Sequence, residues 1–210
     1  MSPRPQLRGS ELKRRLVHAS GTGLPLPYLL GWLSWRQYGL LLLAGAAVAV
    51  ALELLRLVVG FEWALFDELT RPYEEGNPAG YALYAFSVTA VTLVFAPHVA
   101  IPATLMLTLG DPVSGLLGTT REAGEPKRPR TLAAMFAVCL AVSVPFLLPA
   151  AGVAAGGAAS IAAALVATVA DGYKPVVRGY VVDDNASIPL AAAGAAGAVL
   201  GVTGTAPVFF

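Results

Sequence analysis

The sequence has few cysteines, few histidines and little charge. Its 210 residues include one cysteine and two histidines, and charged residues make up 13%. A single cysteine excludes an intrachain disulfide and any metal site built from several cysteines. Cys139 lies inside an apolar run, where filling space is its expected role. In a typical soluble domain roughly a quarter of the residues are charged. Here only 13% are charged and 56% are hydrophobic. The composition therefore excludes intrinsic disorder and predicts a membrane protein.

Several common signatures are also missing. The 14 basic and 13 acidic residues nearly cancel, so the chain has no overall basic field of the kind that holds a protein on nucleic acid. No lysine is followed by serine or threonine, which excludes a Walker-type phosphate loop, and the patterns GxGxxG, HExxH and GxSxG do not occur. Any phosphate chemistry must therefore use another scaffold.

Seven stretches are long and apolar enough to cross a bilayer, which takes about 20 residues. We therefore expect an all-α, polytopic helical bundle in the cell membrane. One domain would cover residues 1–210, with residues 1–15 as a basic cytoplasmic arm. The expected spans are Leu16–Trp35, Tyr38–Val58, Ala79–Ala96, His98–Leu117, Thr131–Pro149, Gly152–Ala170 and Ala186–Thr205.

The charges are distributed unevenly over this topology. With the N-terminus in the cytoplasm, 13 of the 14 basic residues fall on the inner side and only Arg36 falls outside. This distribution is typical of membrane proteins, in which short loops rich in lysine and arginine stay in the cytoplasm. The 13 acidic residues also lie toward the inner side, and so do the long polar connections. Phe61–Leu69 interleaves apolar and acidic residues at helical spacing, which indicates an interfacial amphipathic helix or a plain connector. We expect a polar site that faces the cytoplasm.

Asp111 is the most informative polar residue. It ends an apolar run and precedes Pro112, which disfavours the α region for Asp111 and suits the first turn of a new helix. We therefore expect a broken helix with Asp111 at its N-cap. An ionisable group at membrane depth indicates a substrate or ion site. Ser114, Gly115 and Gly118, which follow Asp111, would leave backbone accessible to a phosphate near that carboxylate. The alternative is a helix cap with no further role.

Asp184 and Asn185 precede the last span in the same way, with Pro189 in its first turns. Asn185 acting only as an N-cap is the alternative. Because Mg²⁺ binds one or two carboxylates together with phosphate oxygens, Asp111 and Asp184 are candidate ligands of a shared divalent cation.

Basic residues gather in two places. Lys13 and Arg14 lie one turn before His18, which either sits at the headgroups or contacts phosphate and assists proton transfer. Lys127, Arg128 and Arg130 either anchor a span on anionic membrane lipids or hold nucleotide phosphates.

Two further charge pairs have helical or turn spacing. Glu53 and Arg56 are three residues apart on an expected helix, and Arg71 and Glu74 have the same separation across a turn. Residues at this spacing face each other on a helix. We expect structural ion pairs at both places.

The order of these motifs resembles the polyprenol kinase family, which includes dolichol kinase, phytol kinase and archaeal relatives. The resemblance covers most of the chain and rests on ELKRRLVH, ELLRL, RPYEEGNPAGYAL, GDPVSGLLG and DDNASIPL. It implies a polytopic enzyme that moves the γ-phosphoryl group of a nucleotide, usually CTP, to the terminal hydroxyl of an isoprenoid alcohol.

Carried over residue by residue, Gly110 and Asp111 match the central acidic site of the family, and Lys13, Arg14 and His18 match its basic-histidine signature. Asp184 and Asn185 match its late Asp-Asn motif. The chain departs from the family after the basic loop, where it reads KRPRTLAAM, so Lys127 and Arg130 both remain candidates for the phosphate-binding position. A glutamate before the Asp-Asn motif is replaced by Asp171.

Other classes fit the sequence less well. A CDP-lipid cytidylyltransferase uses the same nucleotide, but its Pro-Gly-His-Gly-Gly run is missing, and Asp171-Gly172 does not continue into the pattern of CDP-alcohol phosphotransferases. A lipid or ion transporter would place charges at the membrane midplane rather than at one face. A purely structural subunit would leave the gathered charges unexplained.

Overall fold

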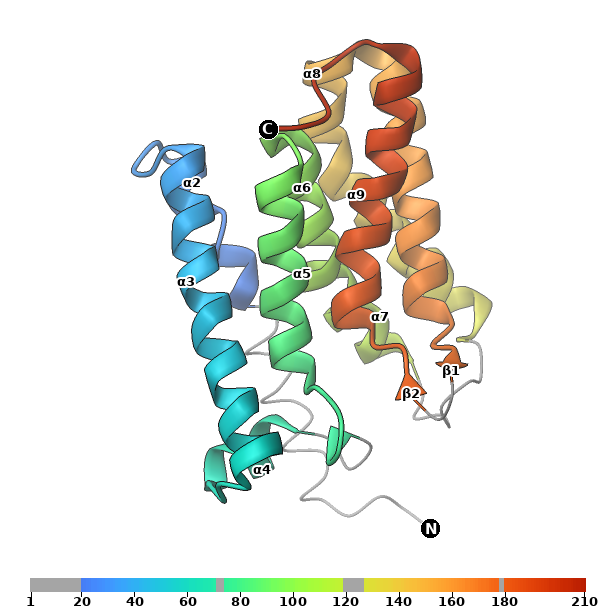
Figure 1. The fold of residues 1–210 in the computed structure, drawn as a ribbon. Coiled ribbons are helices and arrows are strands. Elements are labelled where there is room, and N and C mark those ends of the chain that lie inside the picture. Colours follow the sequence, from blue (N-terminus) through green and yellow to red (C-terminus); the bar gives the residue numbers. More distant parts are fainter. Residues whose placement is uncertain (1–19, 71–73, 119–126, 178–179) are drawn as a thin grey trace.

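The computed structural model describes residues 20–70, 74–118, 127–177 and 180–210, and this part of the chain is mostly helical (Figure 1). The helical elements are η1 (Gly21–Gly23), α2 (Leu26–Leu29), α3 (Trp35–Leu54), η2 (Leu55–Val59), α4 (Ala64–Leu69), α5 (Gly80–Val94), α6 (Pro97–Leu105), η4 (Met106–Gly110), α7 (Asp111–Leu117), α8 (Pro129–Gly172) and α9 (Asp184–Thr203). Two short strands, β1 (Val176–Val177) and β2 (Tyr180–Val181), form an antiparallel pair.

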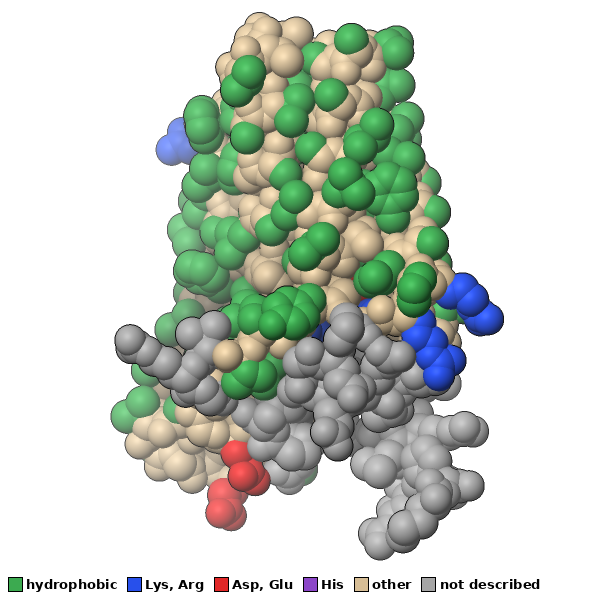
Figure 2. Space-filling view, turned by 90° about the vertical axis from the view of Figure 1, so that its right-hand side faces the viewer, with side chains coloured by type: hydrophobic (Ala, Val, Ile, Leu, Met, Phe, Trp, Pro, Cys, Tyr) green, Lys and Arg blue, Asp and Glu red, His purple; other side chains and the backbone are tan. Residues whose placement is uncertain are grey.

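Four helices in the described ranges are long and apolar enough to cross a membrane. They run over Trp35–Val59, Pro97–Leu117, Pro129–Gly172 and Asp184–Thr203, and α5 is a shorter apolar helix. Figure 2 shows hydrophobic side chains along the flanks of the molecule, whereas most of the charged side chains on this face lie toward its lower end. The expectation of an all-α membrane bundle is confirmed at this level.

The helix α8 is a hairpin of two helical arms. Its chain reverses at Gly152, which has φ of +78° and ψ of 171°, a backbone conformation that is essentially restricted to glycine. The arms then pack so closely that Gly156 lies against the carbonyl of Leu147. In Figure 1 the second arm runs back beside α9. The sequence placed this boundary correctly, between Pro149 and Gly152.

The helix that carries Asp111 differs from the expectation. Asp111 has φ of −61° and ψ of −45°, so it is helical, and the prediction of a broken helix with Asp111 as N-cap is wrong. A π-helical turn, Met106–Gly110, joins α6 to α7 without a break. Such turns are rare and occur often at functional sites. Gly110 is buried, as are Met106, Leu107 and Thr108 of the turn, and this packing overrides the local preference set by Pro112.

The first expected span is also not one helix in its described part. Residues 20–34 form η1, the four-residue α2 and a turn at Gly31, which has φ of +73°. Pro25 and Pro27 interrupt a helix here because each lacks an N–H donor. A capping box formed by Ser34 and Gln37 then starts α3. The prediction of a single helix over Leu16–Trp35 is therefore wrong for these residues.

The polar connections lie together at one end of the bundle. Figure 1 places α4, β1 and β2 at the end where α3 finishes and α9 begins. The helix expected within Phe61–Leu69 is present as α4, where Phe66 is buried and packs edge-on against Trp63 with 5.8 Å between ring centroids. We call this end of the molecule the polar end.

The core between α8 and α9 is built from small side chains. Ala159, Ala163 and Ala167 of α8 are buried, as are Ala192 and Ala196 of α9. Small residues let helix backbones approach closely, which is how helices associate in lipid. This close packing fixes where the polar ends of α8 and α9 meet.

The hairpin in α8 gives a testable prediction. Gly156→Ala should lower the free energy of unfolding by about 1–3 kcal/mol, because the new methyl group would overlap backbone atoms of Leu147 and Leu148. Gly157→Ala is the matched control, since a side chain at Gly157 meets nothing within 4 Å. Thermal unfolding of both variants in detergent measures the difference. Equal midpoints would contradict the hairpin packing.

Candidate functional site

Three aspartates from distant parts of the chain meet at the polar end. Asp111 begins α7, Asp171 lies in the last turn of α8, and Asp184 begins α9. One carboxylate oxygen from each lies within 4.8 Å of the other two. Asp171 and Asp184 are buried, with exposed fractions of 1% and 2%, and Asp111 is half-buried. We call these residues the three-aspartate cluster.

Two lysines partly neutralise this cluster. The Nζ of Lys127 lies 2.6 Å from Oδ1 of Asp171, and the Nζ of Lys174 lies 2.5 Å from Oδ2 of Asp184. Asp171 needs such a partner most, because the C-terminal end of a helix disfavours a carboxylate. With three aspartates ionised and two ammonium groups, the cluster retains one net negative charge.

Ser114 connects Lys127 to Asp171. Its hydroxyl donates to Oδ2 of Asp171 at 2.6 Å and accepts from the Nζ of Lys127 at 2.9 Å. The backbone of Lys127 is fixed as well, because its N–H donates to the carbonyl of Gly172 at 3.1 Å. Ser114 is fully buried, so these bonds form away from bulk water, where an unmade bond is costly.

The donor set fits a hard divalent cation. Carboxylate oxygens are the ligands that Mg²⁺ and Ca²⁺ prefer, and Mg²⁺ combines one or two carboxylates with phosphate oxygens and water. The cluster offers three such groups close to one another. The lysines beside it are suited to anionic oxygens. The arrangement can therefore hold a metal ion and a polyphosphate together.

The structure brings together four of the candidate residues from the sequence: Asp111, Asp184, Ser114 and Lys127. Gly110 has a packing role, because a side chain there would lie 2.7 Å from Sδ of Met135. Gly115 is half-buried in α7.

Of the basic candidate residues in the described part of the chain, only Lys127 lies at the cluster. Arg128 and Arg130 are exposed, so Lys127 rather than Arg130 is the basic residue that lies in the cluster. Lys13, Arg14 and His18 lie outside the described residues.

Two residues at this site, Asp171 of the cluster and Lys174 beside it, were not candidates from the sequence. Asp171 was only matched to a family glutamate, and Lys174 was passed over. The signal available was the position of Asp171 at the end of an apolar span, followed by Lys174 three residues later. That pattern does not reveal the partners, which come from α7 and α9.

Asn185 lies beside the cluster in another role from the one expected. The N-cap of α9 is Asp183, whose Oδ1 accepts from the backbone N–H of Asn185 at 2.9 Å and from its Nδ2 at 2.6 Å. The alternative interpretation, in which Asn185 is only the N-cap, is therefore wrong, and its expected role in binding phosphate stays a prediction. Ser87 donates to the carbonyl of Asn185 at 2.6 Å, and Gly80 leaves room for the amide, since a side chain there would lie 2.8 Å from Nδ2. These contacts bind the start of α9 to α5.

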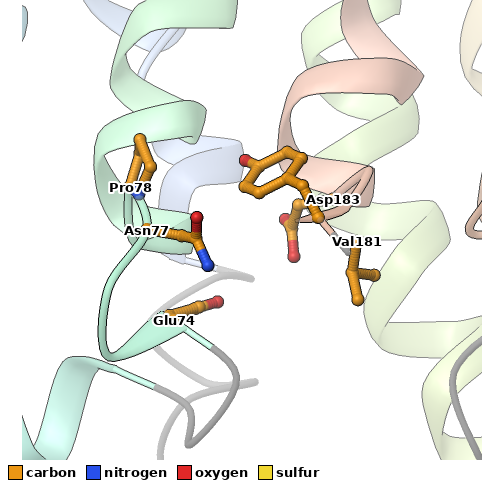
Figure 3. Close-up of a pocket in the computed structure, with 6 residues that line it drawn as sticks. Glu74, Asn77, Pro78, Val181 and Asp183 are labelled. Atoms are coloured by element: carbon orange, nitrogen blue, oxygen red, sulfur yellow. The ribbon is translucent and has the colours of Figure 1, made fainter. Parts of the chain in front are cut away.

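A pocket lies beside Asp183, the residue that caps α9. It is lined by Glu74, Asn77, Pro78, Tyr180, Val181 and Asp183. In Figure 3 the side chains of Glu74 and Asn77 point across the gap toward Asp183. Burial raises the pKa of the Tyr180 phenol, and Asp183 and Glu74 raise it further. Because Asp183 and Asp184 are consecutive, the pocket and the three-aspartate cluster lie next to each other at the start of α9.

The expected pair of Glu53 and Arg56 is present. Arg56 donates to Glu53 at 3.1 Å from Nε and at 2.7 Å from Nη2. It also donates to the carbonyls of Glu74 at 3.1 Å, of Glu75 at 3.3 Å and of Asn77 at 2.6 Å.

Glu53 completes this arrangement by accepting from the backbone N–H of Ala79 at 3.1 Å. The pair therefore fixes the loop that lines one wall of the pocket. The expected pair of Arg71 and Glu74 involves Arg71, which lies outside the described residues.

No family model, curated protein or solved structure matches this chain.

The loop contacts of Arg56 give a second prediction. Arg56→Met should destabilise the protein by about 3 kcal/mol, because it leaves Glu53 buried without its cation and frees three backbone carbonyls. Hydrogen exchange of residues 74–79 should rise strongly. Arg36→Met removes an exposed arginine at the other end of the same helix and serves as the control. Unchanged exchange in Arg56→Met would show that the loop is held by other contacts.

Proposed function

We propose that the protein is a membrane-embedded kinase that transfers the γ-phosphoryl group of CTP to the terminal hydroxyl of an isoprenoid alcohol. The acceptor would be of the dolichol and polyprenol type or of the phytol and geranylgeraniol type. The observation that carries the proposal is the three-aspartate cluster with its two lysines, at the polar end of an apolar helical bundle. The nucleotide and the acceptor class come from the motifs that resemble polyprenol kinases.

The chemistry of the cluster suits phosphoryl transfer, which needs positioning and charge neutralisation more than covalent catalysis. Asp111 and Asp184, with Asp171 beside them, would hold a divalent cation such as Mg²⁺, which would supply neutralisation of the triphosphate charge. The ammonium groups of Lys127 and Lys174 would contact phosphate oxygens.

The reaction forms one bond and breaks one. The acceptor hydroxyl oxygen bonds to the γ-phosphorus, the bond from that phosphorus to the β–γ bridging oxygen breaks, and the nucleoside diphosphate leaves. The hydroxyl proton passes to a carboxylate or an imidazole. Asp171 and Asp184 pair with lysines, while Asp111 forms no ion pair within the described residues. Asp111 is therefore the carboxylate best placed to accept it, with His18 as the alternative.

The start of the described chain supports a role for the N-terminal basic residues. The hydroxyl of Thr22 donates to that of Thr108 at 3.2 Å, and Thr108 lies three residues before Asp111. Four residues of extended chain span at most about 14 Å. His18 lies only four residues before Thr22 in the sequence, so the length of chain between them allows a role for His18 at the cluster.

We further propose that the polar end faces the cytoplasm and that the chain makes seven passes with a cytoplasmic N-terminus. The distribution of lysine and arginine in the sequence supports this orientation. A lipid alcohol in the inner leaflet would then present its hydroxyl at the level where CTP arrives from water.

The test is transfer from labelled CTP. Asp111→Asn should lower phosphorylation of a prenol by at least about 100-fold, because it removes a charged group that acts on the transition state, while the thermal midpoint stays close to that of the parent protein. Glu62→Gln, an exposed acid, is the matched control and should keep activity. Full activity in Asp111→Asn would refute the site.

The position of the label separates the alternatives. A kinase puts the γ-label on the lipid and leaves CDP, whereas a cytidylyltransferase puts the α-label on the lipid and releases pyrophosphate. Chelation of divalent cations should abolish transfer, and Mg²⁺ should restore it. Ion flux in liposomes without nucleotide would indicate a transporter instead.

A further inference from the structure

Lys127 occupies one of the three carboxylates of the cluster. Its Nζ lies 2.6 Å from Oδ1 of Asp171, which is a tight ion pair, and the Asp171 side chain is wholly buried. An ammonium group hydrogen-bonded to that oxygen opposes the binding of a metal ion there, because the two cations compete for the same negative charge and repel each other. A metal ion that binds Oδ1 of Asp171 therefore competes with Lys127, and withdrawal of the ammonium group favours its binding.

The local structure allows this side chain to move while its backbone stays in place. The backbone N–H of Lys127 is held by the carbonyl of Gly172 at 3.1 Å, next to Asp171 in the chain. The Lys127 side chain is 21% exposed, so it has an outlet toward solvent. Rotation of its flexible stem is enough to withdraw the ammonium group from Asp171.

Ser114 prepares Asp171 for the exchange. Its hydroxyl donates to Oδ2 of Asp171 at 2.6 Å, whereas Lys127 holds Oδ1. When the lysine leaves, this hydrogen bond keeps the carboxylate oriented and leaves Oδ1 to the incoming cation. The ammonium group then needs a new anion, which the phosphates of a nucleotide provide.

We propose that Lys127 is a removable counterion that couples the two ligands of the site. In the ligand-free protein it neutralises Asp171; when a divalent cation binds, it moves to a phosphate of the nucleotide. Cation and nucleotide therefore bind cooperatively, and the cation alone binds weakly. This inference deepens the proposed function and rests on it for the identity of the phosphate ligand. The coupling is reciprocal, since each ligand must raise the affinity of the other by the same factor.

The first experiment measures Mn²⁺ binding to the purified full-length protein in detergent, from the electron paramagnetic resonance signal of free Mn²⁺. Without nucleotide, Lys127→Met should bind Mn²⁺ at least about 10-fold more tightly than the parent protein, because the competing ammonium group is gone. A non-hydrolysable CTP analogue should tighten Mn²⁺ binding in the parent protein and much less in the variant. Arg36→Met removes an exposed positive charge far along the chain and should behave as the parent does. Equal Mn²⁺ affinity in Lys127→Met and the parent, or no binding to either, overturns the proposal.

A second experiment needs no variant and so does not depend on Lys127→Met folding. An amine-acylating reagent followed by mass spectrometry reports how accessible Lys127 is in the parent protein. Mg²⁺ alone should raise the labelling rate of Lys127 several-fold, and Mg²⁺ with the CTP analogue should lower it again. A rate that Mg²⁺ leaves unchanged contradicts the displacement.

The outcomes separate this inference from the proposed function. Tighter Mn²⁺ binding in Lys127→Met, in a protein that transfers no phosphate to any prenol, supports the counterion role and refutes the kinase. Transfer from CTP in the parent protein, with Mn²⁺ affinity unaffected by Lys127→Met, supports the kinase and refutes the counterion role.

Discussion

The structure of the polar end depends on one constraint, which is the mutual repulsion of three carboxylates held within 4.8 Å of one another. Like charges at such distances destabilise one another strongly where water is scarce. In the described residues this repulsion is offset by two lysines and one serine, each in direct contact with a carboxylate. Neither lysine belongs to a helix that carries its aspartate partner, so satisfying the aspartates also fixes the segments just outside α8.

Charge compensation is arranged in the same way at Glu53, another buried acid. Glu53 accepts from Arg56 and from the backbone of Ala79, and Arg56 uses its remaining donors on loop carbonyls. The three-aspartate cluster and Glu53 thus both hold irregular backbone against helix ends. Backbone outside regular structure needs such partners at the edge of an apolar bundle, because unpaired polar groups there are costly. The contacts that compensate the buried charges are therefore the same contacts that hold the loops near the candidate site in place.

Hydropathy and a few local signals were enough to predict much of this fold. The apolar runs located α3, α5 and α9, and the Pro-Gly boundary located the reversal of α8 at Gly152. The importance of Asp111 and Asp184 followed from charge at the edge of apolar helices. The helical state of Asp111 did not, because Pro112 indicates a break, and tertiary packing around Gly110 produces a π-helical turn instead.

The composition of the cluster could not be predicted in full for a different reason. Lys127, Arg128 and Arg130 are equivalent by type and lie within four residues, and only their placement relative to Gly172 and Asp171 distinguishes them. Asp171 and Asp111 are sixty residues apart in the sequence, and their approach follows from the packing of α7 on α8. Contacts between residues so far apart in the sequence depend on the packing of the whole bundle, and the hydrophobic periodicity of one segment does not predict them.

The position of the cluster at the edge of the bundle also limits the chemistry that suits it. A soluble triphosphate and a lipid hydroxyl meet only at the membrane surface, and hydrolysis by water competes with transfer there. Burial of Asp171, Asp184 and Ser114 keeps bulk water away from the oxygens that would position the phosphates, and a low local dielectric strengthens each charged contact. The same burial makes an uncompensated carboxylate costly, which is why lysines accompany the aspartates. For the proposed kinase, a site that excludes water and still admits a highly charged ligand would gain from counterions that leave when the ligand arrives.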